Sequence, residues 1–267
     1  MGDKHKRSCC LMIMMVFCIL LVGCETSNQQ AGGRYSEVQG SLQDAAEEDL
    51  AAYWSFDEGE GNILFDETGN NFDGELKCSG DACGPPKRVE GAVGYALDLD
   101  GHGSCGIVNT EGELSVASGI TIEALVFPRS AESMEVFASG WELRVVLING
   151  HLQATLRDDD GIESWNRGPI VDPNKWHHVV VVFDMSEASP LLCLDGTEDT
   201  EGEGASLRDL SAVGEASRGP FHIGSMECRR NFFDGVIDEL RVYSRALTPE
   251  ESIGRWEQYK SLVGSKL

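Results

Sequence analysis

Asp238 is the residue whose position most clearly requires a chemical explanation, because it interrupts the apolar pattern of Phe232–Glu251 (FFDGVIDELRVYSRALTPEE). Side chains along a strand alternate between its two faces, and this alternation predicts that Asp238 shares a face with apolar residues. Those residues are Val236, Leu240 and Val242. A carboxylate buried among them must accept hydrogen bonds, pair with a cation or bind a metal ion. All three possibilities are open at this point.

Two other groups of potential metal ligands have the wrong spacing. The acidic segment Asp158–Asp160 in RDDDGIE lacks the alternating oxygens of an EF-hand, because Leu156 occupies the place of the first ligand. His177 and His178 are adjacent on an expected strand and therefore face opposite sides. We expect a solvated hairpin tip in the first case and structural histidines in the second.

The N-terminus has the composition of an export signal. Lys4, Lys6 and Arg7 precede an apolar run from Cys9 to Val22. The run is shorter than the roughly 20 residues that a spanning helix needs. Residues 21–24 (LVGC) resemble the lipobox of bacterial lipoproteins, in which the cysteine is lipidated and becomes the mature N-terminus. An ordinary cleaved signal that contains a cysteine is the alternative.

Lipid chains on Cys24 would tether the protein to a membrane without spanning it. By the same resemblance, Glu25 in place of an aspartate favours sorting to an outer membrane. We therefore expect an exported protein, anchored by lipid in the bacterial cell envelope, with the outer membrane or the cell surface favoured.

The charge of the chain limits its partners. Of the 21 basic and 45 acidic residues, three and one fall in residues 1–23, which leaves 18 basic and 44 acidic residues and a formal charge of −26. Nucleic acids and anionic lipid surfaces are poor partners for such a surface. Most of these carboxylates are expected to be solvated, although divalent cations and basic partners are compatible with them.

Five cysteines follow the lipobox: Cys78, Cys83, Cys105, Cys193 and Cys228. Exported chains meet an oxidising compartment, so we expect a small disulfide clip between Cys78 and Cys83 in KCSGDACG. Half of a zinc site is the competing interpretation, but the chain lacks a second Cys/His pair at ligand spacing. One of the other three cysteines must stay unpaired, and the sequence does not say which.

The chain divides into four expected segments by composition. Residues 1–23 form the signal, and the polar residues 24–49 form a flexible tether. Residues 50–258 form one domain, and residues 259–267 form a tail. A single domain of about 200 residues is common among all-β sandwiches.

Short alternating segments separated by turn residues dominate the expected domain. They are AAYWSF, YALDLDG, CGIVNT, GITIEALVFP, WELRVVLINGHLQATLR, KWHHVVVVFD, LLCLDG, FHIGS and GVIDELRVY. Asn149-Gly150 and Asp195-Gly196 are hairpin signals, because these pairs readily adopt positive φ. The pattern predicts an all-β fold in which antiparallel sheets pack face to face.

Only the C-terminal part of the domain has helical signals. Thr248 is a candidate N-cap, Pro249 suits the first turn, and Glu251 stands where the acid of a capping box belongs. We expect Ile253 and Trp256 to pack this helix against the sandwich.

Six segments occur in an order that is informative as a set: YWSFDEGEGNILFDETGNNFDGEL, VEGAVGYALDLDG, ITIEALVFP, KWHHVVVVFD, LCLDG and FFDGVIDELRVYSRALTPEES. Together, over roughly residues 51–255, they resemble the laminin-G-like jelly-roll family of the concanavalin A-like lectin/glucanase fold. The resemblance implies a two-sheet antiparallel jelly-roll β-sandwich with a short C-terminal helix. Leu125 departs from the aromatic residue that is usual in its strand, without weakening the fold assignment.

The resemblance also suggests a partner for Asp238. Domains of this fold often hold a structural calcium ion near the chain ends, with the aspartate of G-x-I-D-E, here Asp238, as a ligand. Asp57 in WSFDEGEG is the second position carried over, and Asp66 or a backbone carbonyl could complete the shell. Calcium takes six to eight oxygen ligands, so one ion could join the first and last strands. Hydrogen bonding or pairing of Asp238 with an arginine is the alternative.

Related hydrolases such as laminarinases carry an E-x-D-x-E strand, which this chain lacks. It also lacks a G-x-S-x-G elbow, a P-loop and a zincin motif. A noncatalytic binding or adhesion module for a carbohydrate or an extracellular protein is therefore the first hypothesis, with Trp165 and Trp141 as candidate glycan contacts. A degenerate or divergent glycoside hydrolase and a purely structural envelope lipoprotein are the alternatives.

Overall fold

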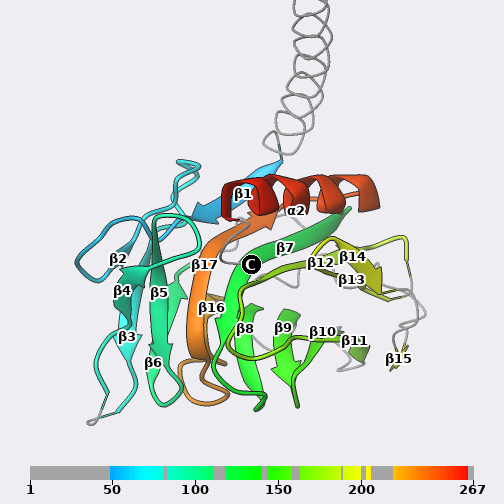
Figure 1. Cartoon of the computed structure of the whole chain (residues 1–267). Helices are drawn as coiled ribbons and strands as arrows, with labels where there is room; N and C mark the ends of the chain where they lie inside the picture. The colour runs from blue at the N-terminus through cyan, green and yellow to red at the C-terminus, as the bar shows by residue number, and fades with distance from the viewer. Residues whose placement is uncertain are drawn as a thin grey trace, which may run out of the picture. The chain divides into compact units, whose positions relative to one another are not determined.

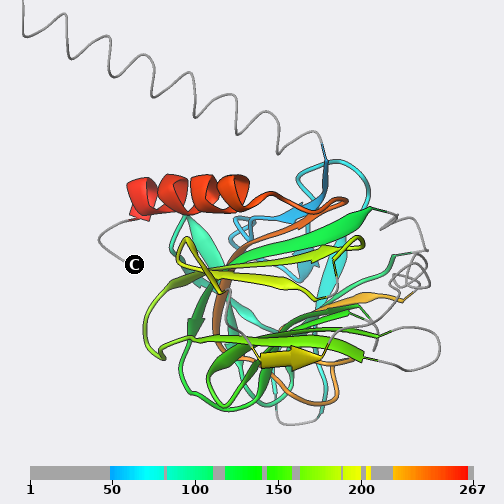
Figure 2. The same ribbon diagram turned by 90° about the vertical axis from the view of Figure 1, so that its right-hand side faces the viewer.

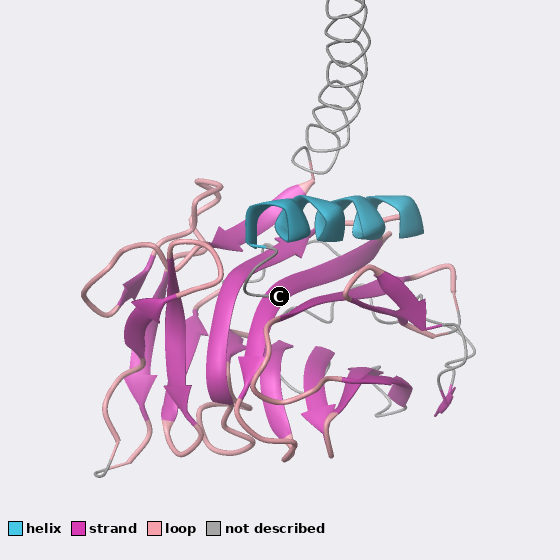
Figure 3. Ribbon diagram, in the orientation of Figure 1, coloured by secondary structure: helices cyan, strands magenta, loops and turns pink. Residues whose placement is uncertain are grey.

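Strands dominate the structure, a computed structural model, and they form two antiparallel sheets (Figure 1 and Figure 3). The residues described are 49–80, 83–110, 118–139, 143–157, 163–187, 189–199, 203–205 and 219–263. All of them belong to the unit Glu48–Leu267. The expected signal, Cys24 and the tether as far as residue 48 lie outside these ranges. Within the ranges, no helix has the length and apolar character that crossing a membrane requires.

Sheet A has the strand order β14-β13-β12-β7-β17-β5-β4, and β1 pairs with β17 beside this path. Its strands are β1 (Leu50–Trp54), β4 (Lys87–Glu90), β5 (Tyr95–Asp100), β7 (Gly119–Pro128), β12 (His177–Asp184), β13 (Leu191–Leu194), β14 (Thr197–Asp199) and β17 (Asp234–Tyr243). The first and last strands of the domain therefore lie side by side.

Sheet B has the order β15-β11-β10-β9-β8-β16-β6-β3-β2. Its strands are β2 (Ile63–Leu64), β3 (Gly74–Cys78), β6 (Ser104–Val108), β8 (Met134–Ser139), β9 (Leu143–Ile148), β10 (His151–Arg157), β11 (Glu163–Ile170), β15 (Glu203–Ala205) and β16 (Phe221–Ile223). One hydrophobic core joins the sheets, with residues such as Ile122 and Val181 from sheet A and Phe137 and Phe221 from sheet B. The predicted antiparallel jelly-roll sandwich is confirmed.

Both predicted hairpin turns are present. Asn149 and Gly150 have φ values of 52° and 77° between β9 and β10. Asp195 and Gly196 have φ values of 51° and 71° between β13 and β14. Asparagine, aspartate and glycine are the residues that tolerate this left-handed conformation most readily, which is why the sequence marks these turns so clearly.

Helix α2 (Pro249–Val263) continues past residue 258, the expected end of the domain, and lies along the outer side of sheet A (Figure 2). Its capping box is confirmed: the Thr248 N–H donates to Glu251 Oε2 (2.7 Å), and the Glu251 N–H donates to Thr248 Oγ1 (3.3 Å). The prediction for Ile253 is wrong, because its side chain is 40% exposed. The prediction for Trp256 is confirmed, because its ring stacks on His178 of β12, with 6.2 Å between the ring centroids. The helix also buries Arg255 and Tyr259.

A buried charge pair explains why a polar side chain can hold the helix. Glu123 on β7 is fully buried, and its Oε1 lies 3.0 Å from Arg255 Nε and 2.8 Å from His178 Nε2. Its Oε2 accepts a hydrogen bond from the Tyr243 hydroxyl (2.7 Å). Burial opposes ionisation, but Arg255 and His178 outweigh it and hold the pKa of Glu123 below its usual value. The helix is therefore docked by a compensated charge as well as by the packing of its aromatic rings.

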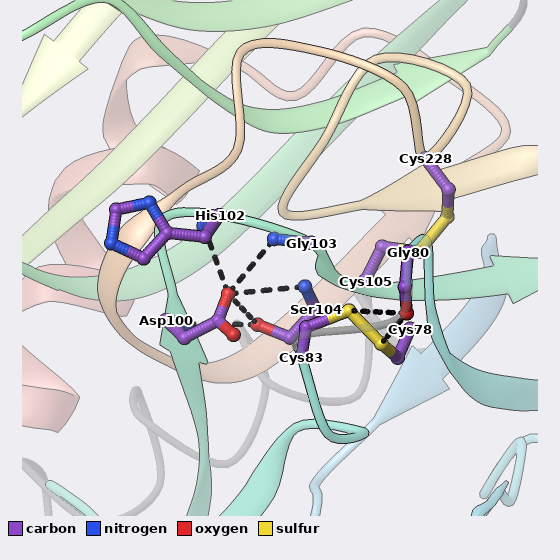
Figure 4. Close-up of a disulfide and its surroundings, with 9 residues drawn as sticks. All are labelled: Cys78, Gly80, Cys83, Asp100, His102, Gly103, Ser104, Cys105 and Cys228. Atoms are coloured by element: carbon purple, nitrogen blue, oxygen red, sulfur yellow. Dashed lines mark hydrogen bonds between the residues drawn. A yellow bond between two sulfur atoms is a disulfide. The ribbon is translucent and has the colours of Figure 1, made fainter.

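Two disulfides lie close together, one starting from the end of β3 and the other from β6 (Figure 4). The predicted Cys78–Cys83 clip is confirmed, and Cys105 pairs with Cys228. Cys193 is the buried cysteine left unpaired, and burial raises the pKa of its thiol to about 11. Beside these disulfides, Asp100 Oδ1 accepts N–H bonds from residues 102–104 (Figure 4). Those bonds outweigh the effect of burial and lower the pKa of Asp100 to about 2.

The two disulfides should contribute unequally to stability. Cys105 and Cys228 are 123 residues apart, whereas Cys78 and Cys83 are five apart. The entropy of loop closure predicts a loss of about 5 kcal/mol when Cys105 and Cys228 are both changed to alanine, and of about 2 kcal/mol for the other pair. Urea unfolding of the two double variants measures the difference. A larger loss from the Cys78/Cys83 variant would contradict this explanation.

Candidate functional site

Strand β17 changes partner halfway along its length. Residues 234–237 pair with β5, and residues 240–243 pair with β1. Between these halves, the register of β17 with β7 shifts between Asp238 and Arg241, and Glu239 has a φ of 53°. This is a β-bulge, a feature that is enriched beside functional sites. We call Asp57, the turn 91–95, Asp238 and Glu239 the fork, because they lie where β1 ends and β5 begins.

Because of the bulge, the prediction that Asp238 shares a face with Leu240 and Val242 is wrong. Leu240 and Val242 point into the core together with Ile237, whereas Asp238 does not share their face. An extra residue in a strand reverses the alternation beyond it, so a strict period of two could not place both halves of β17 correctly. Asp238 is nevertheless fully buried, because the turn 91–95 packs over it.

Asp238 is only partly satisfied by hydrogen bonds. Its Oδ2 accepts the Val93 N–H (2.9 Å), whereas its Oδ1 is buried and has no hydrogen-bond partner among the described residues. Burial, reinforced by the negative charges of Glu239 and Asp57, raises the pKa of Asp238 to about 8, although the N–H bonds from Val93 and Ala92 oppose this shift. A buried polar atom without a partner requires an explanation, and an oxygen ligand of a cation is one.

Asp57 reaches the same turn from the other side. Its Oδ1 accepts the Tyr95 N–H (2.6 Å). A side chain at Gly94 would clash with this carboxylate, and a Cβ at Gly91 would lie 2.5 Å from Asp238 Oδ2. The two predicted ligands therefore hold one turn from its two ends, and glycine at 91 and 94 makes their approach possible. The sequence VEGAVGY contained this signal, but its role was not predicted.

Asp66 has different partners. Its Oδ1 accepts the Tyr53 N–H (3.1 Å), and its Oδ2 accepts the Phe72 N–H (3.2 Å). It also binds the Thr68 hydroxyl (2.7 Å). These bonds shape the loop 66–72 and fasten it to β1. The structure thus brings Asp57 and Asp238 together on one turn, while Asp66 serves a separate loop and its role as a ligand stays a prediction.

The donor set of the fork is compatible with calcium rather than with a transition metal. Across the described ranges there is no group of three or more His, Cys, Asp or Glu side chains that could hold a metal ion. Calcium does not require such a group, because backbone carbonyls and water supply much of its shell. The Oδ1 of Asp238 and the carboxylate of Asp57, which holds the same turn, are oxygen donors of the kind that such a shell uses.

The remaining predicted residues are placed only in part. Trp141 and Asp158–Asp160 lie outside the described residues. Trp165 is on β11, where its backbone pairs with Thr155, and its side chain is not described. His177 and His178 are each bound by a carboxylate, Asp195 (2.8 Å) and Glu123 (2.8 Å) respectively. Those contacts agree with the structural role expected for both histidines.

The sequence profile described as the concanavalin A-like lectin/glucanases superfamily, in its laminin G form, matches residues 100–251. The chain belongs to this superfamily. No curated protein sequence matches the chain.

Solved structures share the fold. Domain 4 of AbnA, a GH43 extracellular arabinanase from Geobacillus stearothermophilus solved in complex with arabinotriose, superposes with a TM-score of 0.59 and 22% identity. The alignment covers 80% of this chain and 98% of that domain.

The binding domain of Paraclostridial Mosquitocidal Protein 1 gives a TM-score of 0.63 and 18% identity over 80% of this chain. The receptor-binding domain of botulinum neurotoxin mosaic serotype C/D gives a TM-score of 0.59 and 16% identity, again over 80% of this chain. This chain spans about half the length of these toxin domains, 53% and 51% respectively. These identities establish a common fold for this superfamily member and no more.

The raised pKa of Asp238 predicts a pH dependence in the presence of a chelator. A carboxyl whose pKa rises from 3.8 to about 8 on folding holds its proton more tightly in the folded state. Its contribution to stability is therefore fully present below about pH 4 and is lost as the pH rises through about 8. Asp238→Asn should remove this part of the slope, as measured by urea unfolding between pH 5 and pH 8. Identical slopes for the wild type and the variant would show that Asp238 does not titrate in this way.

Proposed function

We propose that this protein is a noncatalytic binding module that recognises a carbohydrate or an extracellular protein. The observation that carries the proposal is the likeness to domain 4 of AbnA, which extends over 98% of that domain and concerns a structure solved with arabinotriose. The likeness to toxin binding domains points in the same direction. The fold presents loops and a sheet face on which such a ligand could be bound.

Tethering to a cell envelope is the second part of the proposal. The basic head, the short apolar run and the lipobox-like Cys24 support export followed by lipidation. The two disulfides suit an oxidising compartment. A lipid anchor would hold the binding domain close to the envelope and leave it free to meet extracellular partners.

A structural calcium ion at the fork is the third part. Asp57 and Asp238 would supply carboxylate oxygens, and Asp66 stays a more distant candidate. When bound, the ion would supply the positive charge that neutralises these carboxylates and joins β1, β5 and β17. This proposal is supported by the position of the two carboxylates, because both accept hydrogen bonds from the turn 91–95.

A catalytic role is the weaker alternative. Retaining and inverting glycosidases need two carboxylates that face each other across the substrate. Among the described residues, the buried Glu135 is bound bidentately by Arg144 (2.8 Å at both contacts), and the buried Glu123 is bound by Arg255 (3.0 Å). Carboxylates engaged in this way serve packing better than acid–base chemistry.

Calcium should raise the thermal midpoint of the full chain, and a chelator should reverse this rise. Asp238→Ala should abolish the response, because it removes the buried ligand. Asp172→Ala is the matched control, because that carboxylate is exposed and pairs with Lys175 on the surface. Differential scanning calorimetry measures all three proteins. A wild type whose midpoint does not respond to calcium would return Asp238 to the role of a hydrogen-bonded carboxyl group.

Ligand recognition should be visible as saccharide binding without turnover. We expect the full chain to bind at least one immobilised oligosaccharide, arabinotriose being the first probe, and to release no reducing sugar from it. Trp165→Ala and Trp141→Ala test the predicted aromatic contacts and should each lower the affinity about tenfold if they stack on the sugar. Release of reducing sugar would favour the hydrolase alternative, and absence of binding across neutral and acidic glycans would leave a protein partner or a structural role.

A further inference from the structure

Tyr259 of α2 is buried beside the fork and contacts two of its parts. Its ring belongs to a small apolar cluster with Ala92, from the turn 91–95, and Leu125 of β7. Its hydroxyl donates to Glu239 Oε2 (3.2 Å) in the bulge. One helical side chain therefore joins the turn that Asp238 holds to the bulge that carries Asp238.

Glu239 is held from three directions. The Tyr53 hydroxyl of β1 donates to its Oε1 (2.9 Å), and Arg241 Nη2 donates to its Oε2 (2.7 Å). The Arg241 guanidinium also lies 3.8 Å from the centroid of the Tyr53 ring and bonds to the Tyr259 hydroxyl. The Glu239 carboxylate of the bulge is thus held by contacts from β1, from β17 itself and from α2.

On the side of α2, these contacts continue into sheet A through Arg255. Arg255, one turn before Tyr259, donates to both oxygens of the buried Glu123 (3.0 Å and 3.1 Å) and to the Tyr259 hydroxyl (3.3 Å). Polar groups connected in this way strengthen one another in a buried setting. A continuous chain of buried contacts therefore runs from the middle of sheet A through α2 to the fork.

We propose that α2 is part of the calcium-binding unit, with Tyr259 and Glu239 as positioning residues, so that ion binding and helix docking stabilise each other. The inference rests on the proposed calcium site at the fork. Groups behind the ligands of a metal fix the ligand geometry, and their loss weakens binding even though they do not touch the ion. Linkage then requires the reciprocal effect, in which the ion protects the docked helix.

Tyr259→Phe tests the coupling, because it keeps the ring in the cluster and removes only the hydroxyl. We expect its calcium affinity, measured by isothermal titration calorimetry on the full chain, to fall about fivefold. Tyr53→Phe, which removes the bond from β1, should act in the same direction. In the wild type, calcium should slow hydrogen exchange of the α2 amides, and in Tyr259→Phe it should slow them by a smaller factor.

Glu257→Gln is the matched control on the same helix, because Glu257 is exposed and pairs with Lys260 (3.5 Å). It should leave both the calcium affinity and the exchange response unchanged. Calcium binding of equal strength in Tyr259→Phe and in the wild type, with no effect of calcium on α2 exchange, would overturn the coupling and leave the calcium site intact. A wild type that binds no calcium would overturn the site and the coupling together.

Discussion

The central constraint on this domain is that β17 must pair with two different strands on the same side. β5 and β1 approach it end to end, so neither can supply hydrogen-bond partners along its whole length. The bulge at Asp238 and Glu239 is the structural solution, because it breaks the register with β7 where the partner changes. The buried carboxylate, the glycines at 91 and 94 and the contacts with α2 all follow from this break. The geometry of the candidate site is thus a consequence of the change of partner along β17.

Two buried carboxylates on sheet A show what compensation does to an acid. Glu123 has an arginine and a histidine within hydrogen-bonding distance, and its pKa is lowered despite complete burial. Asp238 accepts a hydrogen bond from a backbone N–H and from no cation within the described ranges, and its pKa is raised to about 8. Glu123 is therefore a buried charge whose partners compensate it fully. The ionised form of Asp238 needs a further partner to compensate its charge. The fork, rather than the Glu123 pair, is therefore the candidate for a ligand site.

Local features of this chain could be predicted from its sequence, and features that depend on distant contacts could not. The Asn149-Gly150 turn and the capping box of Thr248 and Glu251 are determined by neighbouring residues, and both are present. The Cys105–Cys228 pair depends on β6 and the loop after β16 meeting in space, so spacing along the chain carried no signal for it.

The errors on β17 and α2 have the same origin. The strand alternation failed at Asp238 because the bulge arises from the meeting of three strands, none of which reveals it alone. Ile253 was expected to face the sheet because apolar residues usually do, but the position opposite the helix is occupied by the charge of Glu123, which selects Arg255 instead. The pairing of Asp57 and Asp238 on one turn was anticipated only through the family resemblance.

The adjacency of the first and last strands also determines how the domain meets a mechanical load. The backbone carbonyl of Asp49 accepts the Ser244 N–H (2.9 Å), and its carboxylate pairs with Arg245 (2.8 Å). A pull on the chain ahead of Asp49 is first resisted by these contacts and then by the pairing of β1 with β17. Tension applied on the N-terminal side is therefore passed from β1 to β17, the strand that carries the bulge, before it reaches the other strands of sheet A.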